Sequence, residues 1–339
     1  MRYTKVGSLF SLAGIPILTR LFPLFLVWGD FAFSQTETYP AGLISIPSDG
    51  HFSDSTFVVD KDARKLAVYK LQGDLPKKFA EHPADIGKNH GPKERANDYR
   101  TPVGIYFLGK ELTQPEIPFD LYGNFAFVTD YPNVFDQRDA KTGKGIWLHA
   151  VPDKVPLTRG SRGCVVVRND VIKDLRGMVK TEQTPMMISE QIDYLSEVEY
   201  KNQRASFLKH FEDWRSAWEN QDVDKYMKYY DVSFRNDEMN FGQWYKHKKR
   251  LKQQYAYIKV QLSQPLILMN KDQVVIRSLQ RYESNLHKDY GEKTIHARLS
   301  DETGFKIIRE DWVTLPDPAI TLAPMSQSAE IPRAAVTTK

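Results

Sequence analysis

Cysteine is almost absent from this chain, which contains a single one, Cys164, in 339 residues. One cysteine excludes an intramolecular disulfide framework, and the sequence also lacks the Cys and His spacing of a zinc site. It has no glycine-rich phosphate loop, no heptad repeat and no basic stripe interleaved with aromatic residues. We therefore expect no metal, no cofactor and no nucleic-acid partner.

Long apolar runs are missing after residue 34, so no later stretch is expected to cross a bilayer. The first 34 residues have the pattern of an export signal, in which the basic residues Arg2, Lys5 and Arg20 precede a short apolar core at 21–28. The small residues Ala32 and Ser34 predict cleavage near Ser34 and Gln35. An uncleaved anchor is the alternative, but the apolar runs at 6–18 and 21–29 are each too short to span. We expect an exported protein.

The remaining roughly 300 residues are enough for two domains by the usual size relation. Residues 55–190 contain many short strand-like runs separated by Gly and Pro turns, which predicts a mainly-β sandwich or barrel. Residues 200–314 begin with helical periodicity and end in strands, which predicts an α+β domain. We expect residues 35–54 to form a leader and residues 315–339 a disordered tail. The formal charge of +4 and pI near 8.8 suit an anionic polymer such as a cell wall, or simply solubility.

The surroundings of Cys164 favour a nucleophile. A histidine, His149, lies a short loop upstream, and a base near a thiol is the arrangement that nucleophilic catalysis needs. Gly163 permits a tight turn with N–H groups facing outward, and the β-branched residues 165–167 predict a buried strand that would hold this turn rigid. The alternative is an inert core cysteine, since free cysteine is among the most buried residue types.

An ordered series of motifs runs through the first predicted domain: Gly87-Lys88-Asn89-His90-Gly91-Pro92-Lys93, Asp98-Tyr99-Arg100-Thr101-Pro102-Val103-Gly104, Tyr131-Pro132-Asn133 with Asp136, Ile146-Trp147-Leu148-His149 and Ser161-Arg162-Gly163-Cys164. Through this series, residues 55–189 resemble the L,D-transpeptidase catalytic domain, also called the YkuD domain, of bacterial peptidoglycan enzymes.

The second predicted domain has its own series: Trp214 to Trp218, the helix expected at 222–230, Trp244-Tyr245-Lys246 and Phe305-Lys306-Ile307-Ile308. Through it, residues 203–313 are similar to the nuclear-transport-factor-2-like (NTF2-like) domain that follows the catalytic domain in some members. The pair most resembles the cell-shape-determining L,D-carboxypeptidases of curved and helical Gram-negative bacteria.

The resemblance implies a periplasmic enzyme that performs acyl transfer on peptidoglycan stem peptides. Cys164 would be the nucleophile, with His149 as its general base or as the partner of a thiolate–imidazolium pair. Backbone N–H groups near Gly163 and Cys164 would hold the oxyanion, and the backbone carbonyl of Ala150 would orient the imidazole of His149.

Substrate contacts are expected at Arg162, Ser161 and Tyr131, with Arg162 offering a fork to a carboxylate. For Tyr131, and for Asn133 and Asp136, a structural role is the stronger expectation. Lys93 is expected to be a solvated charge.

The chain departs from the family pattern in three places. His149 is followed by Ala150 instead of Gly, the loop before Ser161 is short, and Arg162 replaces a second histidine. The short loop places the usual acceptor groove in doubt. The leading hypothesis is therefore a carboxypeptidase that trims tetrapeptide stems to tripeptides and so influences cell shape.

Two alternatives stay open beside this hypothesis. One is a transpeptidase that joins two diaminopimelates or attaches a protein to the wall, and the other is a non-catalytic wall-binding scaffold. The second domain is expected to form a cone-shaped cavity for a wall or protein ligand, while the oligomeric state stays open.

Overall fold

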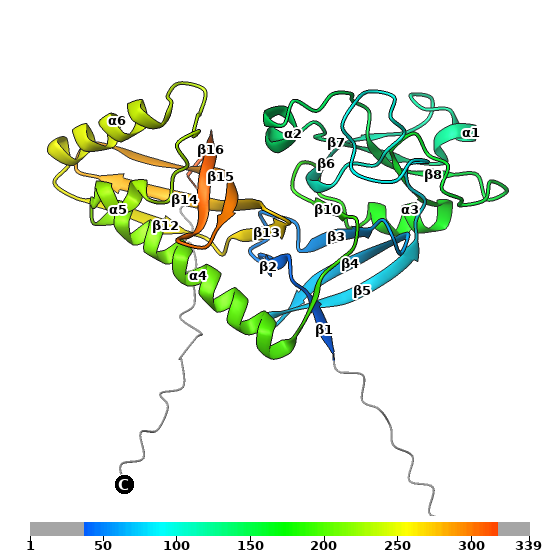
Figure 1. The fold of residues 1–339 in the computed structure, drawn as a ribbon, viewed down its shortest axis with the longest axis horizontal. Coiled ribbons are helices and arrows are strands. Elements are labelled where there is room, and N and C mark those ends of the chain that lie inside the picture. Colours follow the sequence, from blue (N-terminus) through cyan, green and yellow to red (C-terminus); the bar gives the residue numbers. More distant parts are fainter. Residues whose placement is uncertain (1–36, 318–339) are drawn as a thin grey trace, which may run out of the picture. The chain divides into compact units, whose positions relative to one another are not determined.

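The computed structural model describes residues 37–317 (Figure 1). The predicted export signal and most of the predicted tail lie outside these residues. Within residues 37–317, strands form two main sheets, and no helix is long and apolar enough to cross a membrane. The predicted fold class is confirmed: a mainly-β domain precedes an α+β domain.

The first domain is built on an eight-stranded sheet with the order β5-β4-β3-β10-β6-β7-β8-β9. Most neighbours are antiparallel, but β10 runs parallel to β3, and β8 runs parallel to β9. Apolar and β-branched residues of these strands pack into one buried core, which fits their short hydrophobic runs. The strands are β3 (Ser55–Asp60), β4 (Lys65–Gln72), β5 (Leu75–Pro83), β6 (Gly104–Leu112), β7 (Ala126–Thr129), β8 (Trp147–Val151), β9 (Val165–Arg168) and β10 (Pro185–Ser189).

Three short helices lie between these strands: α1 (Phe119–Tyr122), α2 (Val134–Arg138) and α3 (Asn169–Arg176). The side chain of Asn133 accepts hydrogen bonds from the first turn of α2, and Asp136 accepts one from the N–H of Asn133. This reciprocal capping box satisfies N–H groups that a helix start leaves open. Asn133 and Asp136 therefore have the structural role that the sequence favoured.

The second domain places three helices against a six-stranded sheet. Helix α4 (Glu197–Glu219) is the long green helix of Figure 1. It buries its aromatic stripe, Phe207, Phe211, Trp214 and Trp218, against the sheet at helical spacing. The other elements are α5 (Val223–Met227), α6 (Phe241–Gln254), β12 (Ile258–Leu262), β13 (Leu266–Asn270), β14 (Gln273–Ser284), β15 (Lys288–Ser300) and β16 (Gly304–Thr314).

The segment expected to be a leader contains two strands. β1 (Thr38–Pro40) pairs with β11 (Tyr194–Ser196), and β2 (Leu43–Ser45) pairs with β13 of the second domain. Leu43, Ile44 and Ile46 are fully buried. The segment is therefore part of the core, because its apolar residues complete the edge of the second sheet. At the other end, Leu315 donates a backbone hydrogen bond to Tyr290, and Asp317 pairs with Arg281.

Asn270, at the end of β13, links strands of both sheets. Its amide nitrogen donates to the carbonyl oxygens of Gly104 and Ile188, at 3.1 and 2.7 Å, and its amide oxygen accepts from the hydroxyl of Ser189 at 3.0 Å. The side chain is buried, so water cannot replace these bonds.

We predict that Asn270→Ala lowers the free energy of unfolding by about 2–4 kcal/mol, because it leaves buried carbonyl and hydroxyl groups without their partner. Urea denaturation measures this change. The control is Asn202→Ala on the exposed face of α4, which should change stability by less than about 0.5 kcal/mol. Equal stability of the two variants would contradict the proposed link.

Candidate active site

The parallel pairing of β8 with β9 brings the two candidate catalytic residues together. In this register His149 lies beside Val166, and Leu148 lies beside Val165. Cys164 directly precedes β9, so it lies at the level of Trp147. Side chains alternate across a sheet, which places Cys164 on the same face as His149, two positions away on the neighbouring strand. Residues separated along the chain by a loop thus meet at one end of the sheet.

The imidazole of His149 is buried and held in one orientation. Its Nδ1 lies 2.7 Å from the carbonyl oxygen of Ala150. Because a carbonyl can only accept, Nδ1 carries the proton and Nε2 keeps a free lone pair. The ring of Tyr122 from α1 packs edge-on against the imidazole at 5.0 Å. Burial lowers the pKa of His149 to about 4, with the Ala150 hydrogen bond opposing the change, so the ring is neutral at pH 7.

The thiol of Cys164 is also neutral at rest. The thiol donates a hydrogen bond to the carbonyl oxygen of Gly145, which lies 3.6 Å from Sγ. Burial raises the pKa of the thiol to about 11, while the charge of Lys93 acts in the opposite direction. The geometry therefore favours a neutral thiol beside a neutral imidazole over the ion pair that the sequence left open.

The turn before Cys164 is held by Ser161. Its hydroxyl donates to the carbonyl oxygen of Cys164 at 2.7 Å and accepts from the N–H of Gly163 at 3.1 Å. Gly163 has φ +123, and a Cβ there would lie 2.6 Å from the carbonyl oxygen of Arg100, so only glycine fits.

These bonds change two predicted roles. Ser161 shapes the turn through both of its hydroxyl contacts, in place of the substrate contact expected for it. The N–H of Gly163 is already engaged by that hydroxyl and is not free for an oxyanion. The N–H of Cys164 has no partner among residues 37–317.

The loop between His149 and Ser161 is tied down at its far end. The guanidinium of Arg64 donates to the carbonyl oxygen of Leu157 at 2.6 Å and to Asp85 at 3.3 Å. The other oxygen of Asp85 accepts from the N–H of Gly160 at 3.2 Å. Arg162, just beyond the loop, is exposed and has no ion-pair partner within residues 37–317.

Burial decides between the two expectations for Tyr131 and corrects the one for Lys93. Tyr131 is 5% exposed, its hydroxyl donates to the carbonyl oxygen of Thr142, and its ring packs in the core of the first domain, so it has the structural role that was the stronger expectation and not the substrate contact. Lys93 is not a solvated charge: it is 3% exposed, and its ammonium donates to Asp98 at 2.8 Å.

Sequence reasoning missed Tyr122 and Lys61. Tyr122 follows a run with no strong helical signal, so only the structure shows its contact with His149. The buried ammonium of Lys61 donates to the carbonyl oxygens of Gly91 and Thr101, at 2.8 and 2.9 Å. It thereby fixes the segment whose Arg100 carbonyl packs against Gly163. A lone lysine after a strand gives no signal of such a role.

Comparison with known proteins accounts for both domains. Residues 54–188 match the L,D-transpeptidase catalytic domain (YkuD), and residues 206–311 match the Cds6 C-terminal NTF2-like domain. The structure of Bdellovibrio bacteriovorus Bd1075 is 51% identical with a TM-score of 0.77, over 83% of this chain and 100% of that one. The helical cell shape determining protein Pgp2 from Campylobacter jejuni is 28% identical with a TM-score of 0.62, over 80% of this chain and 95% of that one. No curated protein is significantly similar.

We predict that alkylation of Cys164 by iodoacetamide accelerates about tenfold per pH unit from pH 6 to 10. Only the thiolate reacts, and a thiol with pKa of about 11 gains thiolate steadily as the pH rises toward that value. Mass spectrometry of the chain's single cysteine gives the rate directly. A plateau below pH 8 would instead reveal a thiolate–imidazolium pair in the free protein.

Proposed function

Because this chain belongs to the YkuD L,D-transpeptidase catalytic-domain family and carries a C-terminal NTF2-like domain, we propose that it is an exported, periplasmic L,D-carboxypeptidase. It cleaves the bond between diaminopimelate and D-alanine in tetrapeptide stems of peptidoglycan. The observation that carries this proposal is the alignment of Cys164 with an imidazole whose free nitrogen is Nε2.

The first half of the reaction is acylation. The thiol turns from the Gly145 carbonyl toward His149, and its proton passes to Nε2 as sulfur attacks the diaminopimelate carbonyl carbon. The hydrogen bond from Nδ1 to Ala150 then stabilises the imidazolium. When the tetrahedral intermediate collapses, the carbon–nitrogen bond breaks and the imidazolium protonates the leaving amine of D-alanine.

The second half releases the tripeptide. Neutral His149 removes a proton from water, which attacks the thioester carbon, and the sulfur departs and regains a proton from the imidazolium. In both halves the free N–H of Cys164 donates to the oxyanion. A donor placed before the reaction starts needs no reorganisation at the transition state.

Arg162 is proposed to bind the terminal carboxylate of the substrate. It adjoins the nucleophile turn, it is exposed, and no ion pair within residues 37–317 neutralises it. A guanidinium can hold a carboxylate through two parallel hydrogen bonds, which fixes orientation as well as position. This contact would select stems that end in a free D-alanine.

Hydrolysis is favoured over transfer by the short loop. Its anchors, Arg64 and Asp85, keep it against the sheet, and a short anchored loop offers little surface to a second stem. Transfer to an amine of another stem is the second candidate, because the same thioester serves both reactions. A non-catalytic wall-binding scaffold is the candidate from another class.

A role in cell shape is proposed from the relative Pgp2, which is described as a helical cell shape determining protein. Trimming tetrapeptide stems to tripeptides removes the stems that some crosslinking reactions use as acyl donors. The distribution of crosslinks along the wall, and hence its curvature, would change with this activity.

We predict that the purified exported chain removes one D-alanine from a disaccharide tetrapeptide. Cys164→Ala should abolish the activity, and His149→Ala should reduce kcat by about 10²–10⁴-fold, the usual contribution of general acid–base catalysis. Mass analysis of the products is the measurement, with Lys110→Ala on the exposed end of β6 as the control expected to keep full activity.

New stem-peptide dimers joined through two diaminopimelates would identify a transpeptidase. They would also contradict the interpretation that the short loop before Ser161 favours hydrolysis. Equal wall binding by wild type and Cys164→Ala, with no product from either, would favour the scaffold.

We predict that Arg162→Ala reduces kcat/KM for a tetrapeptide with a free terminal carboxylate by about 10–100-fold, the usual value of a charge-assisted hydrogen bond. The matched substrate is the same stem with an amidated terminus. For the wild type, kcat/KM should fall by a similar factor when the free acid is replaced by the amide. For Arg162→Ala, kcat/KM should be the same for the two substrates. A variant that still prefers the free acid by the wild-type factor would exclude this contact.

A further inference from the structure

Helix α6 carries charge of one sign only. Its 14 residues include five Lys or Arg and no Asp or Glu. Opposite charges three or four positions apart stabilise a surface helix, whereas like charges at these spacings repel. The composition of α6 therefore costs helix stability in the free protein, and it indicates that this helix meets something anionic.

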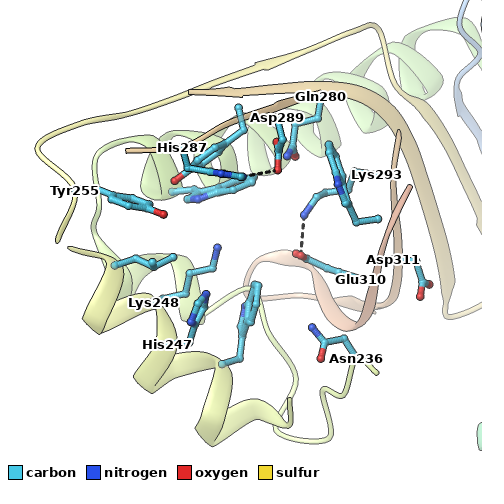
Figure 2. A pocket seen from close by; sticks show the side chains of 15 residues that line it. Asn236, His247, Lys248, Tyr255, Gln280, His287, Asp289, Lys293, Glu310 and Asp311 are labelled. Atoms are coloured by element: carbon cyan, nitrogen blue, oxygen red, sulfur yellow. Dashed lines mark hydrogen bonds and ion pairs between the residues drawn. The ribbon is translucent and has the colours of Figure 1, made fainter. Parts of the chain in front are cut away.

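One of the five cations turns inward and does not belong to the surface. Lys248 is 8% exposed, and Figure 2 shows its side chain reaching into the cavity of about 400 Å³ between α6 and strands β14, β15 and β16. Trp244 and Leu251 line the same cavity, which identifies the inner side of the helix.

The outer side of α6 is a basic face formed by Lys246, Lys249 and Arg250. These residues follow the i, i+3, i+4 spacing of one side of a helix, and all three are exposed. Within residues 37–317 the one ion pair of this face joins Lys249 to Asp224 at 3.8 Å. Arg250 lies 3.0 Å from the ring nitrogen of His247, which supplies no negative charge. The basic face therefore keeps a net positive charge, which attracts anionic surfaces over about 10 Å in 0.1 M salt.

An apolar tip, Tyr257 and Leu286, lies at the end of the domain where α6 stops. The first residue of β12, just after α6, pairs with the last residue of β14. The N–H of Ala256 donates to the side chain of Asn285 at 2.8 Å, which ties the loop after α6 to the turn between β14 and β15. Leu286 is 69% exposed and Tyr257 38% exposed. Single exposed leucines are common, so the surroundings of this one carry the argument.

Those surroundings are basic. The ammonium of Lys259 lies 5.5 Å from the ring centre of the tip's tyrosine. Glu283 pairs with the exposed Lys288 at 3.1 Å, and Asp289 pairs with His287 at 3.1 Å, as Figure 2 shows. Because these two carboxylates are engaged, they do not offset the charge of Lys259 or of the basic face.

The apolar tip distinguishes between anionic partners. A soluble polyanion, such as a charged polysaccharide, would bind the basic face but would leave Leu286 in water. At a bilayer surface, an apolar side chain enters the acyl boundary, a tyrosine ring lies at the level of the headgroups, and Lys or Arg bind lipid phosphates. This end of the domain offers all three kinds of group.

We propose that this end of the second domain docks on an anionic phospholipid bilayer, with Leu286 and Tyr257 in the interface and the basic face of α6 on the lipid phosphates. Docking is peripheral and reversible, because one leucine and one tyrosine bury far less apolar surface than a stable anchor does. The docking surface is separate from the residues around Cys164 and from the cavity behind α6, so it does not depend on the proposed hydrolysis.

The test is flotation of the purified exported chain with lipid vesicles. Vesicles of phosphatidylcholine alone are compared with vesicles of phosphatidylcholine and phosphatidylglycerol in equal parts. We expect the anionic vesicles to bind at least about tenfold more tightly, because each cation near such a surface adds attraction. Binding should weaken as sodium chloride is added, since salt screens the surface charge.

Two variants separate the contributions of charge and of the apolar tip. Replacing Lys246, Lys249 and Arg250 together by Gln should weaken binding to anionic vesicles at least about tenfold. Its matched control replaces three exposed lysines of the first domain by Gln, which removes the same charge elsewhere and should bind like wild type; these are Lys78, Lys110 and Lys173.

Leu286→Ser should weaken binding to the same vesicles by about three- to tenfold, because it removes the apolar group that enters the interface. Val232→Ser, at an 83% exposed position in the turn after α5, is its control and should bind like wild type. Circular dichroism checks that each variant is folded.

Three results would each overturn the proposal: equal binding of wild type to neutral and anionic vesicles, equal losses in the α6 variant and its control, or full binding by Leu286→Ser. The last would point to a soluble polyanion as the partner of the basic face. The wild-type comparison uses the unaltered chain, so it holds even if a variant fails to fold.

Discussion

The parallel pairing of β8 with β9 is the constraint on which the rest of the catalytic domain depends. A parallel pair needs a crossover connection, and here the connection is the loop that ends at the nucleophile turn. A shift of one residue in this register would move His149 to the opposite face from Cys164. The anchors Arg64 and Asp85, the turn made by Ser161 and the glycine at 163 all hold this one register in place.

The same burial that fixes the site also sets its protonation. Desolvation pushes the pKa of the Cys164 thiol up and that of the His149 imidazole down, so neither is charged at neutral pH. Lys93, buried and paired with Asp98, acts against this rise by lowering the thiol's pKa. The proton therefore passes from the thiol to the imidazole only when the substrate is bound, because the substrate brings the carbonyl carbon that the sulfur attacks. A thiol that is neutral at rest is also less open to oxidation than a thiolate.

Sequence predicted the features that are local. The strand-like runs of the first domain and the helical stripe of α4 each show in a few neighbouring residues. The contact between His149 and the carbonyl of Ala150 was implied by the family resemblance. It did not predict that Leu43 and Ile44 complete the edge of the second sheet, because the pairing partner β13 lies more than 200 residues away and strands this short have weak patterns. Nor did it predict that the N–H of Gly163 is engaged, since that depends on one rotamer of Ser161. Lys93 and Lys248 were hidden for the same reason: the burial of a lysine depends on distant elements.

Burial of titratable groups follows one physical rule in both domains. Each holds a titratable group away from water without its full set of partners, which costs stability in the free protein. The catalytic domain tolerates this at Cys164 and His149 because both can become neutral. Lys248, on α6 of the second domain, is 8% exposed and can also lose its proton, but the rings of Trp218 and Trp244 beside its ammonium favour the charged form.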